Sequence, residues 1–354
     1  MTARKQHLVT KEQDLLDERG NIAEPGYATK PIWRYHRNQI KANKLRIKEW
    51  DYYYVGDNAH GIALTIADAG YISSIQTSLF GFGVAEDEPF QINYGVIGFF
   101  PLGKLNMPHK SSSGTTKADV KGAHFIFEHE GKNRHLHGRF ENYNKSGSTL
   151  TFDLTLGEEP QETMVIATPF DADKHFYYNQ KINCMPANGT VTFEGKTYRF
   201  SAENGAMGVL DWGRGVWTRN NRWYWGSGSM LLDDGSAFGY NIGYGFGNTS
   251  AASENMLFYN GKAHKLDDVI FHIPKRPDGS YDYLSPWSFT ETNKRFEMRF
   301  EPILDRYDPV DLKIISMKPH QTFGRLYGTA ILDDGKQIEL TGQVGLAEHV
   351  HNCW

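Results

Sequence analysis

"RWYWGSGSMLLDDGSAFGYNIGYGFG", residues 222–247, is the stretch that decides the fold. Aromatic residues alternate with small ones on both sides of the LDDG signal at Leu232–Gly235. Aromatic residues favour extended strands, and a tight hairpin needs a residue that tolerates positive φ, which glycine supplies. The stretch therefore predicts two antiparallel strands joined by a primed hairpin turn.

The same pattern continues through most of the chain. Runs such as HGIALTIAD, TLTFDLTL and FEMRFEPI have the composition and alternation of strands with one wet face. A second LDDG signal stands at Leu332–Gly335, and further hairpin turns are predicted at Asn188–Gly189, Asn260–Gly261 and Asp278–Gly279. Roughly twenty strands are predicted, enough for two barrels or for one long sandwich.

The chain divides into three parts on this reading. Residues 1–45 are polar and contain Pro25 and Pro31, so we expect an extended arm with one short helix around Glu12–Arg19. If the strands close into two barrels, residues 46–205 form the first and residues 206–354 the second.

Composition limits the classes of function. The chain has 354 residues, 39% hydrophobic and 23% charged, with a net charge of −4, which favours neither disorder nor electrostatic nucleic-acid binding. No run of apolar residues is long enough to span a membrane, and the first residues lack the apolar core of a secretory signal. Two distant cysteines, Cys184 and Cys353, fit free thiols. We therefore expect a cytoplasmic protein without a membrane span.

A candidate catalytic set precedes the hairpin in "ENGAMGVLDWGRGVW". Asp211, Glu203 and Arg214 stand among aromatic residues, where charges are rarely buried unless they are paired or used. A carboxyl group desolvated by indole rings has a raised pKa and donates a proton near neutrality. We predict that Asp211 or Glu203 is the proton donor and that Arg214 orients an anionic or carbonyl group.

Aromatic and amide residues of the same region are predicted to contact the substrate. Core packing is the alternative for any single tryptophan among them. The predicted substrate-binding residues are Trp212, Trp217, Trp223, Trp225, Tyr240 and Asn241.

The segment "GLAEHVHNCW" supplies a second candidate set. Glu348, His349 and His351 are predicted to act as a ligand set or as acid/base groups, and Trp354 to fill an apolar space. A solvated tail is the alternative, because chain ends usually fray.

A metal motif is considered in "GKNRHLHGRFEN". His135, His137 and Glu141 have the H-x-H-x3-E spacing of cupins. The later histidine of a cupin has no counterpart, since none follows "PANG" until His264. We therefore expect a polar strand face and no metal. A phosphate-binding loop is not indicated either, and no cofactor is expected.

Two resemblances add to this interpretation. The order "GVLDWGRG", "WYW", "LDDG" and then Tyr240 resembles a segment of proteins similar to the carotenoid 1,2-hydratase (hydroxyneurosporene synthase) and of AttH-like proteins. Over nearly its whole length, with "LLDERG", "KEWDYYYV", "FYYNQK" and "EHVHNCW", the chain is similar to domain-of-unknown-function family 2804.

The hydratase-like resemblance implies an all-β fold of two lipocalin-like (calycin) antiparallel barrels in tandem, with a pocket at or near their junction. It also implies relatives that hydrate a double bond or catalyse pericyclic cyclisation of apolar small molecules. This chain has Trp212 and Arg214 where the hydratase-like motif has histidine and tryptophan, and Asp211 is the ionisable position that matches.

The function predicted from these observations is a cofactor-free enzyme that acts on an apolar or aromatic small molecule by hydration or dehydration, isomerisation or cyclisation. One alternative is a carbohydrate-active hydrolase or lyase with paired carboxylates and tryptophan platforms. The second alternative is a non-catalytic lipocalin-type carrier of a small molecule.

Overall fold

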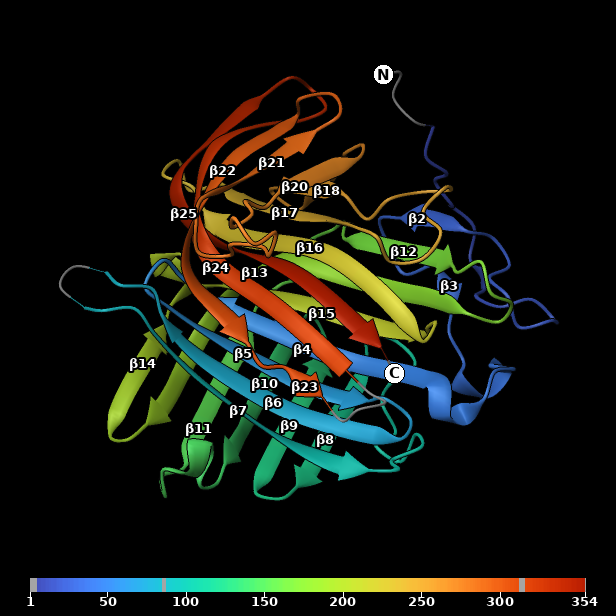
Figure 1. The fold of residues 1–354 in the computed structure, drawn as a ribbon, viewed down its shortest axis with the longest axis horizontal. Helices are drawn as coiled ribbons and strands as arrows, with labels where there is room; N and C mark the ends of the chain where they lie inside the picture. Colours follow the sequence, from blue (N-terminus) through green and yellow to red (C-terminus); the bar gives the residue numbers. More distant parts are fainter. Residues whose placement is uncertain (1–4, 85–86, 312–315, 354) are drawn as a thin grey trace.

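The computed structural model describes residues 5–84, 87–311 and 316–353. The strands form two large, curled antiparallel sheets in tandem, each approaching a barrel (Figure 1). This architecture confirms the predicted all-β fold with two lipocalin-like barrels. The helical elements described are single 3-10 turns: η1 (Arg37–Gln39), η2 (Lys44–Arg46), η3 (Tyr143–Lys145) and η4 (Ala202–Asn204).

The first sheet contains the strands β2 (Gly26–Ala28), β4 (Ile47–Gly56), β5 (His60–Asp68), β6 (Ile72–Gly81), β7 (Phe90–Phe99), β8 (Gly114–Val120), β9 (Ala123–Glu130), β10 (Asn133–Phe140), β11 (Leu150–Leu156), β12 (Met164–Pro169), β13 (Phe176–Phe193), β14 (Lys196–Phe200) and β15 (Met207–Val216). Its order is β7-β6-β5-β4-β15-β13-β11-β10-β9-β8, with β12 and β14 paired to β13 and β2 paired to β12.

The second sheet contains the strands β16 (Asn220–Leu231), β17 (Ala237–Tyr244), β18 (Met256–Tyr259), β19 (Lys262–Lys265), β20 (Val269–His272), β21 (Trp287–Glu291), β22 (Phe296–Tyr307), β23 (Val310–Asp311), β24 (Ser316–Ile331) and β25 (Gln337–Cys353). Its order is β19-β18-β17-β16-β25-β24-β22-β21-β20, with β23 paired to β24. The C-terminal strand β25 therefore lies in the middle of the sheet.

The two sheets part between Val216 and Asn220. The sequence placed the division between residues 205 and 206, which would assign β15 to the second barrel. In the structure β15 pairs with β13 and β4 of the first sheet along its whole length. The strand that carries "LDWGRG" is thus a wall of the first barrel.

The N-terminal arm is extended and packs across the first barrel. Its strand β1 (Gln13–Asp14) pairs in parallel with β3 (Trp33–Arg34), and β2 extends the first sheet. The helix predicted around Glu12–Arg19 is wrong. Leu15 and Leu16 are both buried, and the Leu15 amide donates to the Arg34 carbonyl, so pairing with the rest of the arm outweighs the weak helical tendency of so short a segment.

The turns follow the predictions in part. Leu232–Gly235 and Leu332–Gly335 both turn the chain, but only their final glycines have positive φ, +80° and +86°. They are therefore longer loops that end in a left-handed glycine, and not the primed two-residue turns that were predicted. Asn260–Gly261 is a primed turn with both φ values positive, whereas Asn188–Gly189 lies inside β13.

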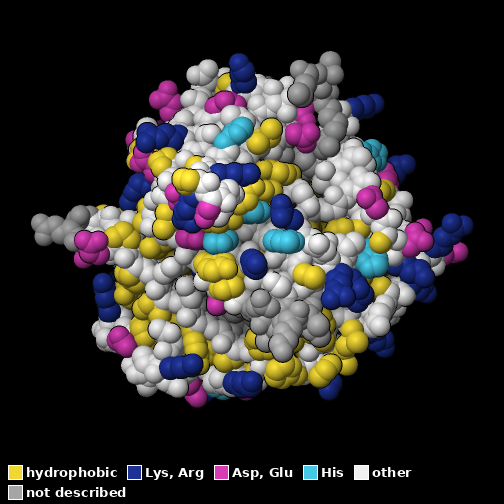
Figure 2. Space-filling model, in the orientation of Figure 1, with side chains coloured by type: hydrophobic (Ala, Val, Ile, Leu, Met, Phe, Trp, Pro, Cys, Tyr) yellow, Lys and Arg dark blue, Asp and Glu magenta, His cyan; other side chains and the backbone are white. Residues whose placement is uncertain are grey.

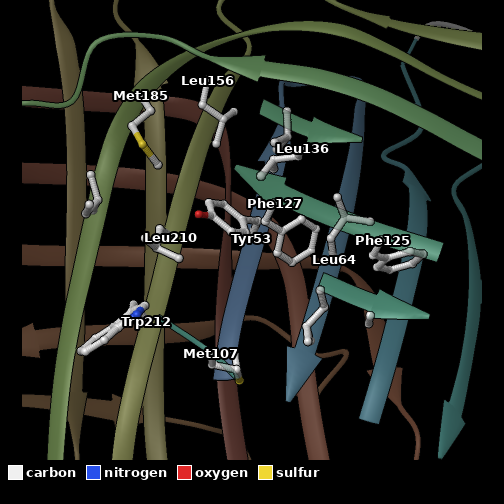
Figure 3. Close-up of a cluster of buried hydrophobic side chains, with 14 of the residues drawn as sticks. Tyr53, Leu64, Met107, Phe125, Phe127, Leu136, Leu156, Met185, Leu210 and Trp212 are labelled. Carbon is white, nitrogen blue, oxygen red and sulfur yellow. The ribbon is translucent and has the colours of Figure 1, made fainter. Parts of the chain in front are cut away.

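Apolar side chains fill the interior of each barrel. Figure 3 shows part of the first core, to which strands from around the sheet and the loop between β7 and β8 contribute side chains: Tyr53, Leu64, Met107, Phe125, Phe127, Leu136, Leu156, Met185, Leu210 and Trp212. The second core includes Phe238, Tyr240, Trp287, Phe300 and Leu326. Because both interiors are packed, the space for a ligand has to be sought elsewhere.

Two smaller apolar clusters join the barrels. One combines Tyr177 of β13 with Phe258 of β18. The other combines Tyr52 of β4 with Trp225 of β16 and Phe323 of β24. The outward faces of the two sheets therefore pack against each other.

Acidic and basic side chains are mixed over the face seen in Figure 2, as expected for a nearly neutral chain. Within the described ranges, none of the helices has the length and apolarity that a membrane crossing requires.

Candidate active site

A cavity of about 250 Å³ lies between the two barrels, where their outward faces meet. Seven aromatic rings line it: Trp50, Tyr52, Tyr177, Trp217, Trp223, Trp225 and Phe246. The polar residues that line it include Lys181, Asp211, Glu254, Arg306, Gln321 and Glu348. The site is therefore an aromatic chamber that contains several ionisable groups.

Strand alternation places the central charges. Asp211 of β15 stands in register with Lys181 of β13 and Tyr52 of β4 on the outward face of the first sheet. Glu348 of β25 stands in register with Trp225 of β16 and with β24 on the outward face of the second sheet. The central charged groups of each wall thus lie within a set of three adjacent strands.

Asp211 is held by an ion pair and two neutral donors. The Lys181 Nζ lies 2.6 Å from Asp211 Oδ2, and Oδ1 accepts from Asn179 Nδ2 at 2.6 Å and from Trp50 Nε1 at 3.2 Å. The same ammonium group lies 4.4 Å from the centre of the Trp225 ring, a cation–π contact. These contacts fix both charged groups in place.

A glycine makes room for one of these donors. A Cβ atom on Gly213 would come within 1.8 Å of Trp50 Cζ2, so the indole can cross the strand only where no side chain stands. The Trp50 ring stacks on Tyr177 and meets Trp217 edge-on. The spacing "D-W-G" in β15 thereby lets an indole reach the carboxylate of Asp211.

Glu348 has a different environment. It is half-buried, its Oε2 accepts from Trp223 Nε1 at 2.8 Å, and its Oε1 lies 3.4 Å from Gln321 Nε2. Burial, with a smaller contribution from the Asp211 charge, raises the pKa of Glu348 to about 7, while the Trp223 hydrogen bond and the charges of Lys181 and Arg306 partly oppose the rise. The carboxyl group is therefore largely protonated below neutral pH.

A third carboxyl group completes the wall. Burial raises the pKa of Glu254, whose Oε2 lies 3.3 Å from Asn241 Nδ2. Asn241 Oδ1 in turn accepts from Trp225 Nε1 at 2.8 Å. This chain of hydrogen bonds fixes the orientation of the Trp225 indole toward the cavity.

Arg306 links the two walls at one side of the cavity. Its Nη1 donates to Gln321 Oε1 at 3.1 Å, and its Nη2 donates to Gln76 Oε1 of the first sheet at 3.2 Å. Both partners are neutral amides, so the positive charge of the guanidinium is available to a ligand.

A family model described as Domain of unknown function (DUF2804) matches residues 6–354. The chain belongs to this family. A comparison with curated protein sequences gives no match.

Two solved structures resemble this DUF2804 chain. Kievitone hydratase from Nectria haematococca is 11% identical, with a TM-score of 0.52 over 97% of this chain and 98% of that chain. An AttH-like protein from Nitrosomonas europaea is 13% identical, with a TM-score of 0.48 over 91% of this chain and 98% of that chain. At this level of identity the first likeness establishes a shared fold.

Five of the residues predicted from the sequence line the cavity of the DUF2804 chain: Asp211, Trp217, Trp223, Trp225 and Glu348. Asn241 lies directly behind them and binds Trp225. The structure therefore brings together two predicted carboxyl groups, three predicted tryptophans and one predicted amide.

Arg214 and Trp212 lie on the opposite face of β15 and point into the first barrel (Figure 3 for Trp212). The Arg214 guanidinium is fully buried, with Nη1 3.0 Å from Asp51 Oδ1 and Nε 3.9 Å from Glu49 Oε1. Adjacent residues of a strand face opposite sides, so neither can share the cavity with Asp211.

Glu203 and Tyr240 are also remote from the cavity. Glu203 is exposed on η4 and borders a separate surface depression, and Tyr240 is buried in the second core. They do not converge with Asp211 as the sequence led us to expect.

The two C-terminal histidines also face away from Glu348. His349 points into the second barrel, where its ring stacks on Tyr224 and its Nδ1 lies 2.8 Å from the Tyr283 hydroxyl. Burial lowers the pKa of His349 to about 4. The His351 Nε2 lies 2.9 Å from Asn220 Oδ1 near the surface, and desolvation lowers its pKa. Trp354 lies outside the described residues.

Sequence reasoning missed Trp50, Glu254 and Arg306. Glu254 and Arg306 stand in no recognisable motif, and Trp50 lies in the quoted "KEWDYYYV" but was not assigned to the site. Each of the three reaches the cavity from a different strand or loop. Lys181 lies in the quoted "FYYNQK", but only the sheet order shows that it stands in register with Asp211.

Proposed function

We propose that this protein is a cofactor-free enzyme that acts on an apolar or aromatic small molecule by acid/base chemistry: addition or removal of water, isomerisation or cyclisation. The observation that carries the proposal is a pair of carboxyl groups with different environments in one aromatic cavity. Burial raises the pKa of Glu348 to about 7, whereas Asp211 is paired with Lys181. Two carboxyl groups in such different settings are typical of an acid and a base.

In a hydration reaction, Glu348 acts as the acid and Asp211 as the base. Glu348 gives its proton to one carbon of a double bond, water adds its oxygen to the other carbon, and Asp211 accepts the proton that this water releases. Return of that proton from Asp211 to Glu348 restores the starting state. Positive charge that develops on carbon is stabilised by the faces of the surrounding indoles. Dehydration follows the same steps in reverse.

Arg306 takes the orienting role that the sequence assigned to Arg214. Its guanidinium borders the cavity with two neutral amide partners, so it can bind a carbonyl, phenolate or carboxylate of the substrate. The aromatic walls provide flat apolar surfaces. An aromatic molecule with one oxygen-bearing substituent fits this combination.

The two alternatives receive less support. A carbohydrate-active site presents indoles as an exposed platform, but Trp217 and Trp225 are only 8% and 5% exposed. A carrier needs only neutral lining, whereas this cavity contains Asp211, Glu348 and Lys181. Buried charges are costly unless they are used, which favours the enzyme.

The test is turnover of a panel of aromatic alkenes and aryl unsaturated ketones in ¹⁸O-labelled water, followed by mass spectrometry. The similarly folded kievitone hydratase is named for hydration, which makes this the first reaction to examine. We expect Glu348→Gln and Asp211→Asn to lower kcat by about 100-fold or more. Glu203→Gln, on the exposed η4, is the matched control and should retain full turnover.

Wild-type turnover in both cavity variants would contradict the proposal. Binding of panel molecules without any turnover, measured by quenching of tryptophan fluorescence and unchanged in both variants, would favour the carrier instead.

A further inference from the structure

We propose that Glu128, His135 and His137 form a zinc site on the outer wall of the first barrel. The three residues lie on the adjacent strands β9 and β10, neither of which contributes a residue to the cavity between the barrels. Their ligand atoms all lie within 4.8 Å of one another. The site is independent of the proposed acid/base function.

The β-ladder places the ligands on one face. His135 and His137 alternate with the buried Leu136 and therefore both point outward, and Glu128 stands directly opposite His135 on β9. The three side chains are between 29% and 39% exposed, so the site is open to solvent while its backbone is held on both sides of β10. A rigid, accessible set of this kind suits a metal with open positions for water.

One ring nitrogen of each of the two histidines is turned toward Glu128. The His135 Nε2 lies 2.9 Å from Asp153 Oδ1 on β11, so a proton on Nε2 turns the Nδ1 lone pair toward Glu128. The His137 Nε2 is buried and has no hydrogen-bond partner among the described residues, although Glu128 Oε2 lies 3.4 Å away. Two ring nitrogens thus face one carboxylate oxygen without a well-formed hydrogen bond, and a cation between them satisfies all three.

The distances agree with tetrahedral zinc. Zinc bonds to nitrogen and oxygen of about 2.0–2.2 Å place two ligand atoms roughly 3.3–3.5 Å apart. His137 Nε2 already lies 3.4 Å from Glu128 Oε2, and His135 Nδ1 lies 4.0 Å from the same atom, which a small side-chain rotation corrects. Two imidazoles and one carboxylate are a donor set that favours Zn²⁺ over Mg²⁺ or Ca²⁺.

The motif considered in the sequence consisted of His135, His137 and Glu141, and from it we expected a polar strand face without a metal. The structure places Glu141 one residue beyond β10, where it binds Arg139 and contacts His124. The carboxylate of the site comes instead from Glu128, seven residues before His135 and opposite it across the hairpin.

The experiment is isothermal titration of the untagged, chelator-treated full chain with zinc chloride, with magnesium chloride as the competing probe. We expect saturable binding of one Zn²⁺ per chain and no response to Mg²⁺. His135→Ala and His137→Ala should each weaken binding at least tenfold. Asp153→Asn, which alters the positioning residue, should weaken it by about 10- to 100-fold.

The matched control is His272→Ala, which removes a strand histidine of the second barrel that contacts Thr290. Unchanged thermal unfolding of each zinc-free variant shows that the fold is intact. Absorption of the Co²⁺-substituted protein adds a spectroscopic readout, because tetrahedral nitrogen and oxygen ligation gives strong visible bands that the histidine variants should lose. Absence of saturable zinc binding, or wild-type affinity in both histidine variants, would overturn the proposal.

Discussion

Glu348→Gln tests the central electrostatic claim about the cavity without any knowledge of the substrate. The folded protein raises the pKa of this carboxyl group from 4.5 to about 7, mainly by burial. Between these two pH values the folded chain retains a proton that the unfolded chain has lost. The free energy of unfolding therefore falls as pH rises, by about 1.4 kcal/mol per pH unit.

The size of this change in the free energy of unfolding follows from the difference between the two pKa values of Glu348. The contribution of Glu348 is fully present below pH 4.5, is lost progressively as pH rises, and is gone above about pH 7. Complete burial would give a loss of about 3 kcal/mol, and water that enters the cavity reduces it to about 2–3 kcal/mol. Glutamine keeps an oxygen that can accept from Trp223 Nε1 but does not titrate.

The assay is urea unfolding of the wild type and the variant across this pH range, monitored by circular dichroism. We expect the variant to gain about 2–3 kcal/mol relative to the wild type between acidic and neutral pH. Glu203→Gln, which changes an exposed carboxyl group, is the control and should show a constant difference. A constant difference for Glu348→Gln as well would refute the claim that Glu348 holds a proton near neutrality, and with it the assigned acid.

Three further substitutions probe the packing around the site, each measured by urea unfolding. Lys181→Met leaves the Asp211 carboxylate without its cation and should cost about 3–5 kcal/mol, most of which the double variant with Asp211→Asn recovers. Gly213→Ala places a Cβ atom against Trp50, so we expect a loss of about 1–3 kcal/mol and a shifted tryptophan emission; unchanged stability would contradict the close contact. Arg214→Met leaves the buried Asp51 carboxylate without its cation, whereas Glu49 keeps its ion pair with Arg37; the substitution should cost about 3–5 kcal/mol, while the turnover of the molecules that still fold is retained. A selective loss of turnover would instead return Arg214 to the catalytic set.

The sequence predicted the fold class because its cues are local. Alternation and turn signals such as Leu232–Gly235 depend on neighbouring residues, and they identified the antiparallel strands and their number approximately. The helix predicted around Glu12–Arg19 failed because the pairing partner of that segment, Arg34, is remote along the chain. Local patterns do not carry such information.

Within the candidate site, too, the residues that cluster in the sequence were predicted and those that come together only in the fold were not. Asp211 and the tryptophans of β16 were found because they cluster in one stretch, although Arg214 in the same stretch faces the other side of its strand. Glu348 was noted beside His349, but only the sheet order brings it opposite Asp211. Arg306 arrives from β22 without a motif, so no single-sequence signal assigns it to the cavity.

The alternation of β25 has a consequence for how this protein tolerates change. Glu348 and Val350 border the cavity, whereas Ala347 and His349 face the second barrel. In a saturation scan of these positions, substitutions of Glu348 and Val350 should mainly change the response to ligand. Substitutions of Ala347 and His349 should mainly lower the abundance of the protein in cells. Natural variation along the same strand can then alter the choice of ligand at every second position while the intervening positions keep the barrel intact.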